Sequence, residues 1–163
     1  MHPHYLIDGY NLIHLVSDLQ QCLDRGLEEA RTMLIHYMQS YLAAHQVRMT
    51  IVFDGDNVGR AEPPVRTSGR LKIIYSTPPE KADPVIKRLI DTAKNRRAMI
   101  LVSADHELIR YGTRSGVQIL SPQQFYERLR QPIHQESMDQ KFNSKLFDEE
   151  LADWLKLFGA PDQ

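Results

Sequence analysis

Carboxylates recur in this sequence at the ends of short apolar runs or at the start of the helix that follows one. A cluster of carboxylates raises the pKa values of its own members by mutual repulsion unless a cation lies between them. Mg²⁺ and Mn²⁺ prefer such oxygen ligands, and a bound ion can activate water for attack on a phosphodiester, with two ions about 3.5–4 Å apart in two-metal sites. These residue types therefore suit divalent-metal hydrolysis. The aspartates in question are Asp8, Asp54, Asp83 and Asp105.

The elements that must position these acids alternate along the chain. Apolar runs predict strands at residues 5–7, 49–53, 71–75, 98–102 and 117–120. Helical periodicity and capping residues predict helices at residues 27–44, 81–93, 106–111 and 122–129. The stretch 57–69, which holds glycine, Pro-Pro and arginine, is interpreted as an exposed loop. Strands that alternate with helices predict an α/β fold with a parallel sheet and helices on both faces.

The predicted sheet brings the aspartates to a common place. Three of them follow predicted strands, and Asp83 begins the helix after the third strand. Because the carboxyl ends of parallel strands share one edge of a sheet, where ligands bind, we expect all four acids to converge. An aspartate at a strand end is also a common turn or helix-cap residue, and for any single position that interpretation is equally good. The four together favour a shared site.

Two neutral side chains and one histidine lie close to these acids in the sequence. Asn11 follows Asp8 within the same turn, and its amide either hydrogen-bonds a carboxylate, a metal-bound water or a phosphate, or caps the next helix. Ser103 either contacts phosphate or a metal-bound water, or is a plain turn hydroxyl. Of the seven histidines, only His106, next to Asp105, is a candidate proton shuttle.

Four pieces of the sequence, taken in order, resemble the NYN branch of the PIN-like nucleases, and in particular its bacterial YacP-like members. They are residues 7–13 (Ile-Asp-Gly-Tyr-Asn-Leu-Ile), 52–55 (Val-Phe-Asp-Gly), 81–83 (Lys-Ala-Asp) and 102–105 (Val-Ser-Ala-Asp). The Asp-Gly-Tyr-Asn piece is fairly specific at an N-terminal strand end, and the other pieces gain weight from their order. The resemblance runs from about residue 4 to residue 130.

The resemblance implies both a fold and an activity. The fold would be an α/β, PIN-like three-layer sandwich, with a five-stranded parallel sheet in the order 3-2-1-4-5 flanked by helices. The activity would be that of a hydrolase, a divalent-metal-dependent endoribonuclease that cleaves single-stranded RNA with a metal-activated water. The partner would be RNA, free or within a ribonucleoprotein, and the cofactor Mg²⁺ or Mn²⁺.

The resemblance also implies roles for individual residues. The metal-binding acids would be Asp8, Asp83 and Asp105. Asn11 and Asp54 would complete the catalytic pocket. The family pattern leaves open whether Asp56 or Glu80 takes part, so both are second-tier candidates together with His106.

Basic residues near the acids are candidates for holding the RNA backbone, because phosphate oxygens accept hydrogen bonds from such side chains. Each of them could equally be an ordinary solvated surface charge. Several fall between the second and third predicted strands, and others flank the acids on the following helices. The candidate substrate-binding residues are Arg66, Arg70, Lys72, Lys81, Ser103 and Arg110.

Composition limits the remaining choices. The chain has 163 residues with a net charge of −1, which excludes a globally basic nucleic-acid binder, and the single cysteine excludes an intramolecular disulfide. No apolar run is long enough to span a membrane, so we expect a cytoplasmic protein without membrane contact. Residues 1–132 are predicted to form the nuclease domain. Residues 133–163 are predicted to form an acidic helical appendage around Trp154, a candidate surface for a homodimer or a protein partner.

Two other functions fit parts of the sequence. Asp54 and Asp56 after an apolar strand match the loose Asp-x-Asp pattern of aspartyl-phosphate phosphohydrolases, in which the first acid attacks phosphate. That motif normally opens its fold, whereas here a strand and a helix precede it. A non-catalytic RNA-binding adaptor would keep the fold, but it would not need the full set of acids.

Overall fold

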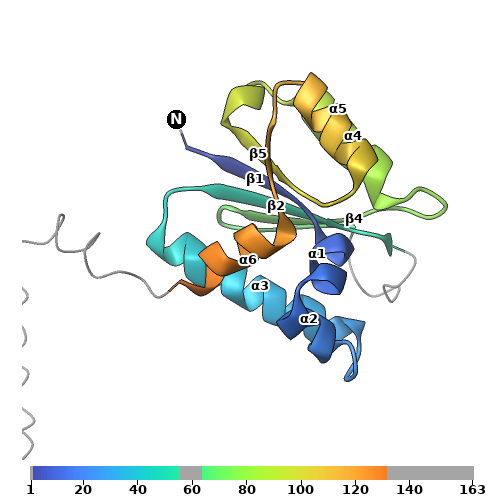
Figure 1. The fold of residues 1–163 in the computed structure, drawn as a ribbon, viewed down its shortest axis with the longest axis vertical. Helices are drawn as coiled ribbons and strands as arrows, with labels where there is room; N and C mark the ends of the chain where they lie inside the picture. The colour runs from blue at the N-terminus through green and yellow to red at the C-terminus, as the bar shows by residue number, and fades with distance from the viewer. Residues whose placement is uncertain (1, 56–63, 132–163) are drawn as a thin grey trace, which may run out of the picture. The chain divides into compact units, whose positions relative to one another are not determined.

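A mixed sheet covered by helices on both faces forms the described part of the chain in the computed structural model (Figure 1). The structure describes residues 2–55 and 64–131. Its strands are β1 (His4–Asp8), β2 (Arg48–Phe53), β3 (Val65–Ser68), β4 (Leu71–Tyr75), β5 (Met99–Val102) and β6 (Gln118–Leu120). Their order in the sheet is β3-β4-β2-β1-β5-β6, and every neighbouring pair is parallel except β3 with β4.

The parallel part of the sheet confirms the predicted strands and their order, since β4-β2-β1-β5-β6 is the predicted order 3-2-1-4-5. The prediction of a purely parallel, five-stranded sheet is wrong, because β3 adds an antiparallel edge strand where a loop was expected. All four residues of β3 are exposed, so the strand shows no apolar pattern. Gly69, with φ of +58°, makes the tight turn into β4. The rest of that predicted loop, residues 57–63, lies outside the described residues.

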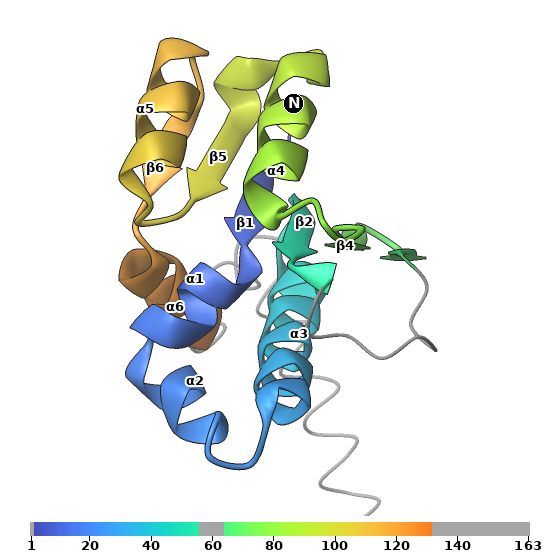
Figure 2. The same ribbon diagram turned by 90° about the vertical axis from the view of Figure 1, so that its right-hand side faces the viewer.

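Helices form a layer on each face of the sheet. They are α1 (Gly9–Leu15), α2 (Ser17–Cys22), α3 (Leu27–Ala44), α4 (Ala82–Thr92), α5 (His106–Arg114) and α6 (Pro122–Arg130). The first three and α6 cover one face, whereas α4 and α5 cover the other (Figures 1 and 2). The prediction for α3 is confirmed at both ends, and α5 continues three residues beyond its predicted end. The sequence did not predict α2, a single short helix of six residues.

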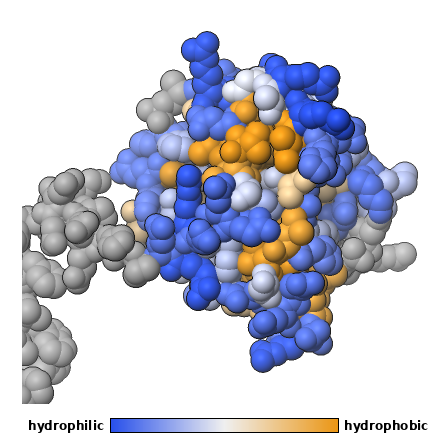
Figure 3. All heavy atoms as spheres, viewed as in Figure 1, coloured by the Kyte–Doolittle hydropathy of each residue, from blue (hydrophilic) through white to orange (hydrophobic). Residues whose placement is uncertain are grey.

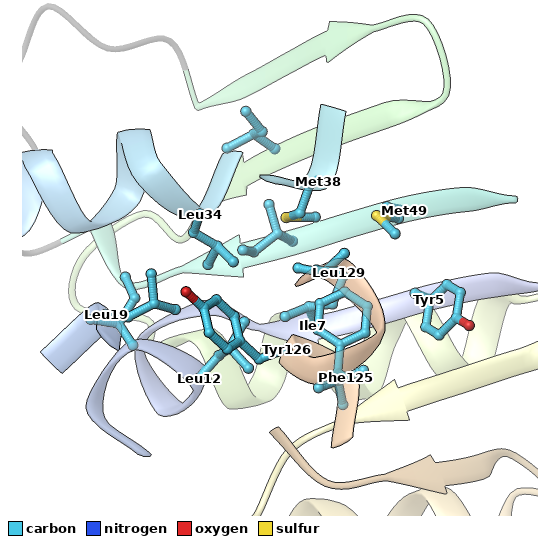
Figure 4. Close-up of a cluster of buried hydrophobic side chains, with 14 of the residues drawn as sticks. Tyr5, Ile7, Leu12, Leu19, Leu34, Met38, Met49, Phe125, Tyr126 and Leu129 are labelled. Atoms are coloured by element: carbon cyan, nitrogen blue, oxygen red, sulfur yellow. The ribbon is translucent and has the colours of Figure 1, made fainter. Parts of the chain in front are cut away.

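The central strands are buried on both faces, which explains why they appear in the sequence as continuous apolar runs. Ile51 and Phe53 of β2 belong to the core cluster under α3, while Val52 between them belongs to the cluster under α4. Figure 4 shows the larger cluster, in which Leu12 of α1 and Tyr126 of α6 pack towards the sheet. Truncating such a fully buried side chain to alanine typically costs about 2–5 kcal/mol.

The described surface carries little large apolar exposure. Leu15 at the end of α1 and Val65 at the start of β3 are its exposed large hydrophobic residues. On the face drawn in Figure 3, the orange hydrophobic patches are bordered by hydrophilic residues. Within residues 2–55 and 64–131, no helix is long and apolar enough to cross a bilayer.

Candidate active site

The four aspartates meet at the edge where the parallel strands end, which Figure 2 turns towards the viewer. Asp8 is the last residue of β1, and Asp54 directly follows β2. Asp83 lies in the first turn of α4, and Asp105 is the N-cap of α5. Their charges act on one another, since the pKa of Asp8 is raised by Asp83 and Asp54. We call this set of four aspartates the acidic edge.

Asp8 is the most buried member of the acidic edge, with 8% of its surface exposed. Burial, followed by the negative charge of Asp83, raises the pKa of Asp8 to about 7. Two hydrogen bonds oppose that rise, one from the backbone N–H of Asn11 and one from the hydroxyl of Ser103. The Ser103 hydroxyl donates to Oδ2 of Asp8 over 3.4 Å. A carboxylate in this position is costly without a cation beside it.

Asn11 and Ser103 join the first strand–helix turn to the turn after β5. Oδ1 of Asn11 accepts a hydrogen bond from the backbone N–H of Ala104 at 2.8 Å. The hydroxyl of Ser103, which is almost completely buried, accepts one from the backbone N–H of Asp105 at 3.1 Å. Because α1 already begins at Gly9, Asn11 lies inside the helix and is not its cap. Both side chains therefore fix the positions of the acids on either side.

Two of the aspartates also stabilise the start of a helix. Oδ1 of Asp54 accepts the backbone N–H of Ala82 at 2.7 Å, where α4 begins. Oδ1 of Asp105 accepts the backbone N–H of Leu108 at 3.1 Å, as an N-cap does. Each of these two contacts uses Oδ1, one of the two carboxylate oxygens. The capping interpretation and the functional interpretation of a strand-end aspartate are thus compatible in this fold.

Asp83, in the first turn of α4, is close enough to other acids for their charges to act on it. Partial burial raises the pKa of its carboxyl, and the charges of Asp105 and then Glu107 raise it further. Lys87 opposes this effect, and its Nζ forms an ion pair with Oε1 of Glu107 at 2.7 Å. The repulsion around Asp83 thus comes from Asp105 and Glu107 at the start of α5 and from Asp54 after β2.

The donor chemistry of the acidic edge fits a hard divalent cation. Carboxylate oxygens are the ligands that Mg²⁺ and Mn²⁺ prefer. Burial first, and then the charges of neighbouring acids, raise the pKa values of Asp8 and Asp83, and a bound cation would favour their charged forms. As placed within residues 2–55 and 64–131, no three His, Cys, Asp or Glu side chains form a closed ligand set. Mg²⁺ often keeps several waters, so direct contact with every acid is not required.

The second-tier candidates divide into different environments. Glu80 forms a two-pronged ion pair with Arg88, with 3.0 Å between Oε2 and Nη2, and this hydrogen bonding holds the Glu80 pKa below its ordinary value. His106 is the exposed first residue of α5. Asp56 lies outside the described residues. The structure thus leaves His106 beside the acidic edge, while the carboxylate of Glu80 already has a cationic partner.

Three of the predicted substrate-binding side chains lie on the elements that reach the acidic edge. Lys81 is the exposed residue before α4, and Arg110 is exposed on α5. Arg66 is exposed on β3, where it pairs with Ile73 of β4. Ser103, the fourth candidate, is buried against Asp8, as described above.

Arg70 and Lys72 lie near the beginning of β4, so the structure does not bring them to the acidic edge. The guanidinium of Arg70 donates to the backbone carbonyls of Leu42, His45 and Val47, with 3.1 Å to the last of these. Lys72 is close enough to His4, the first residue of β1, to lower the pKa of its imidazole. Both residues belong to the opposite edge of the sheet.

Sequence reasoning missed a buried arginine behind the site. Arg31 of α3 is 8% exposed, and its Nη1 donates to the hydroxyl of Tyr10 at 2.9 Å. The Tyr10 ring packs on Phe53 with 5.1 Å between centroids, and its hydroxyl is near enough to Asp54 for that charge to raise the Tyr10 pKa. The signal was available, because position 31 falls on the apolar face of the helix.

A second missed residue, Ser76, supports the turn that carries Asp54. Its buried hydroxyl accepts the backbone N–H of Gly55 at 3.0 Å. A side chain at position 55 would overlap the carbonyl oxygen of Ser76, so the turn requires glycine. No pattern in the sequence around Ser76 marks this role.

Comparison with known proteins places these features in a wider group. A family model described as the YacP-like NYN domain matches residues 5–156. A curated relative from Bacillus subtilis strain 168, described as uncharacterized protein YacP, is 33% identical over 98 residues, which cover 60% of this chain and 57% of the relative. The alignment thus spans little more than half of that relative's length.

Solved structures resemble the described fold. The crystal structure of Rae1 (YacP) from Bacillus subtilis has a TM-score of 0.69 and 25% identity, covering 96% of this chain and 88% of that chain. A crystal structure of a mutant of that protein has a TM-score of 0.65 and 24% identity, covering 78% of this chain and 74% of that chain. The mixed α/β architecture is therefore shared with solved proteins.

Proposed function

Since the chain belongs to the YacP-like NYN domain family, we propose that it is a divalent-metal-dependent endoribonuclease acting on single-stranded RNA. The family suggests a ribonuclease, and the acidic edge supplies the chemistry. The observation that carries the proposal is Asp8, a buried carboxylate whose pKa is raised to about 7 beside Asp83 and Asp54. Acids that repel one another destabilise the folded state. Their presence together at the ligand-binding edge of the sheet therefore points to a function that needs them, namely binding a cation for a reaction.

Each residue of the acidic edge has a part in this proposal. Asp8, Asp83 and Asp105 would hold Mg²⁺ or Mn²⁺, which supplies an activated water and stabilises charge on the phosphodiester. Asn11 and Ser103 hold the turns that carry these acids, through the backbone N–H groups of Ala104 and Asp105. Asp54 fixes the start of α4 and thereby the position of Asp83.

The RNA would lie across the acidic edge on cations of neighbouring elements. Lys81, Arg66 and Arg110 are exposed and suit phosphate oxygens, which accept hydrogen bonds without regard to sequence. We further propose a cytoplasmic protein that meets RNA free or within a ribonucleoprotein. The predicted appendage, residues 133–163, remains a proposed surface for self-association or a protein partner. It lies outside the described residues, which end at position 131.

The test is cleavage of a panel of single-stranded RNAs with Mg²⁺ or Mn²⁺. Asp8→Asn and Asp83→Asn should each lower the cleavage rate by about 100-fold or more, because each removes charge from the proposed cation site. Asp24→Asn, at an exposed aspartate in the turn before α3, is the matched control and should cleave as the wild type does. Independently of activity, Mn²⁺ should raise the Tm of the wild type but not of Asp8→Asn.

The other outcomes separate the competing functions. Cleavage that survives both substitutions would show that the acids are assigned wrongly. Hydrolysis of a phosphomonoester that depends on Asp54 alone would indicate an aspartyl-phosphate phosphohydrolase. RNA binding by the wild type without cleavage under any metal condition would indicate an adaptor.

A further inference from the structure

The segments that lead into the parallel strands carry no acidic residue, and all of them except residues 115–118 carry basic residues or histidine. They are residues 2–4, 45–48, 69–72, 93–98 and 115–118. The register of the sheet places the starts of the strands together, since His4 pairs with both Arg48 and Met99, and Met49 pairs with Leu71. These segments lie at the left of Figure 1, where β1 begins, and the acidic edge lies at the other end of the strands. We call them the basic edge.

Two arginines of the basic edge are explained by the fold. Arg70 donates to carbonyls at and beyond the end of α3, as described above. Arg96 donates from Nε to the carbonyl of Ile90 at 3.1 Å and from Nη2 to that of Asp91 at 3.0 Å, at the end of α4. The carbonyl end of a helix favours a cation, so these two arginines stabilise the helices.

Four further cations of the basic edge have no such role. They are Arg48, Lys72, Lys94 and Arg97, which are exposed and form no ion pair with another residue in the described part of the chain. The charges of Arg48 and Lys72 act together on His4, whose pKa is lowered first by burial and then by these two residues. Asp91 is the aspartate closest in sequence to this edge, and its carboxylate accepts the hydroxyl of Tyr111.

The basic edge is also hollowed. One hollow of about 460 Å³ is lined by His2, Arg48 and Arg70, among others. A second, of about 260 Å³, shares His2 and Arg48 with the first and adds His4 and Lys94. Neither lining includes an aspartate or a glutamate. The two hollows adjoin at His2 and Arg48, and each has two cationic side chains among the neutral residues of its lining. Positive charge spread along two hollows suits an extended polyanion better than one small anion.

We propose that the basic edge binds the phosphodiester backbone of RNA, as a second contact surface opposite the acidic edge. The choice of RNA as the polyanion rests on the proposed function. A strand of five residues at about 3.3 Å per residue separates the two edges by roughly 16 Å, so a long RNA can contact both edges while a very short one contacts only one. Contacts to phosphates are independent of base sequence and weaken with salt.

The test measures the affinity of the full chain for fluorescently labelled single-stranded RNA, by anisotropy in EDTA so that no cleavage occurs. For a long RNA, Arg48→Gln/Lys94→Gln should raise Kd by about three- to tenfold at 0.1 M salt. The slope of log affinity against log salt should also become less negative by about 1.4, because each lost phosphate contact with a single strand removes about 0.7. Arg25→Gln, at an exposed arginine away from the basic edge, is the control for loss of a surface charge and should change Kd little.

Three results would overturn the proposal: a wild type that binds no RNA, a double variant with unchanged Kd and salt slope, or an equal loss in Arg25→Gln. A thermal melt checks that the double variant is folded. The nuclease proposal is tested separately, by cleavage of a very short RNA, which the double variant should cut at the wild-type rate. Weakened binding without any cleavage by the wild type would support the basic edge and contradict the nuclease. Cleavage by the wild type, together with unchanged RNA binding by the double variant, would support the nuclease and contradict the basic edge.

Discussion

The two edges of the sheet handle charge in opposite ways. At the basic edge, Arg70 and Arg96 direct their guanidinium groups to the carbonyl ends of α3 and α4, so that helix and cation stabilise each other. At the acidic edge, the carboxyl of Asp8 is buried beside like charges, which raise its pKa. The first arrangement favours the folded state, whereas the second opposes it at neutral pH.

The difference separates residues kept for stability from residues kept for function. Asp54 and Asp105 cap helix starts, so their presence alone could be explained by the fold. Asp8 makes no such contribution, because its neutral form is the one that the folded protein prefers below about pH 7. Among the four aspartates, Asp8 is therefore the most informative about function.

The largest expected effect concerns the turns at the two edges. Gly55→Ala should lower the free energy of unfolding by about 3 kcal/mol, because the new Cβ overlaps the backbone carbonyl of Ser76 beside Asp54. Gly69→Ala, in the β3–β4 turn of the basic edge, should cost only about 1 kcal/mol, because its positive φ is strained for alanine but the space around it is open. Urea denaturation of both variants measures the difference. Equal losses would show that the Asp54 turn is no more tightly packed than the hairpin.

The next effect is a pH-dependent gain in stability when the carboxylate of Asp8 is removed. Between about pH 4 and pH 7 the folded protein holds a proton on Asp8 that the unfolded chain releases, so the stability of the wild type falls as pH rises through this window. Asp8→Asn removes that dependence. In EDTA, the free energy of unfolding of Asp8→Asn should exceed that of the wild type by about 2 kcal/mol more at pH 8 than at pH 5.

Denaturation at the two pH values measures this gain, with Asp24→Asn as the control, since that aspartate is exposed. A gain of the same size at both pH values would mean that Asp8 is not protonated in the folded state at pH 5. A loss at both would mean that its carboxylate makes favourable contacts that outweigh its burial. Either result would remove the contrast between the two edges.

The sequence predicted the parallel sheet and the convergence of the acids because both follow from simple rules. Strands buried on two faces must be continuously apolar, and the ends of parallel strands must share an edge. The hairpin escaped prediction because Val65–Ser68 is exposed throughout and pairs only along one side. Its polar residues matched a loop equally well.

The substrate-binding prediction failed for Arg70 and Lys72 because of the direction of β4. A strand parallel to β2 begins at the opposite edge of the sheet, so residues at the start of β4 lie away from the acids. The chain leaves β2 at the acidic edge, and β3, antiparallel to β4, carries it back, so that Ser68 pairs with Leu71 at the far end. Arg66, earlier on the strand, stays nearer the acids. The position of Arg31 on the apolar face of its helix indicates that it is buried, but its contact with Tyr10 depends on tertiary packing that no local pattern encodes.

The smallest expected effect distinguishes the two kinds of cation within the basic edge. Arg70→Met should lower the free energy of unfolding by about 1–2 kcal/mol, because the carbonyls of Leu42 and Val47 lose a charged donor. Arg48→Met should change it by less than about 0.5 kcal/mol, because Arg48 is exposed and forms no ion pair with the described residues. Urea denaturation gives both values, and RNA binding in EDTA should show the reverse ranking, with the larger loss in Arg48→Met. The contrary result would be a larger loss of RNA affinity in Arg70→Met than in Arg48→Met, with the stability of Arg70→Met unchanged. The guanidinium of Arg70 would then bind phosphate and not the helix carbonyls. The division of this edge into structural and RNA-binding cations would be wrong.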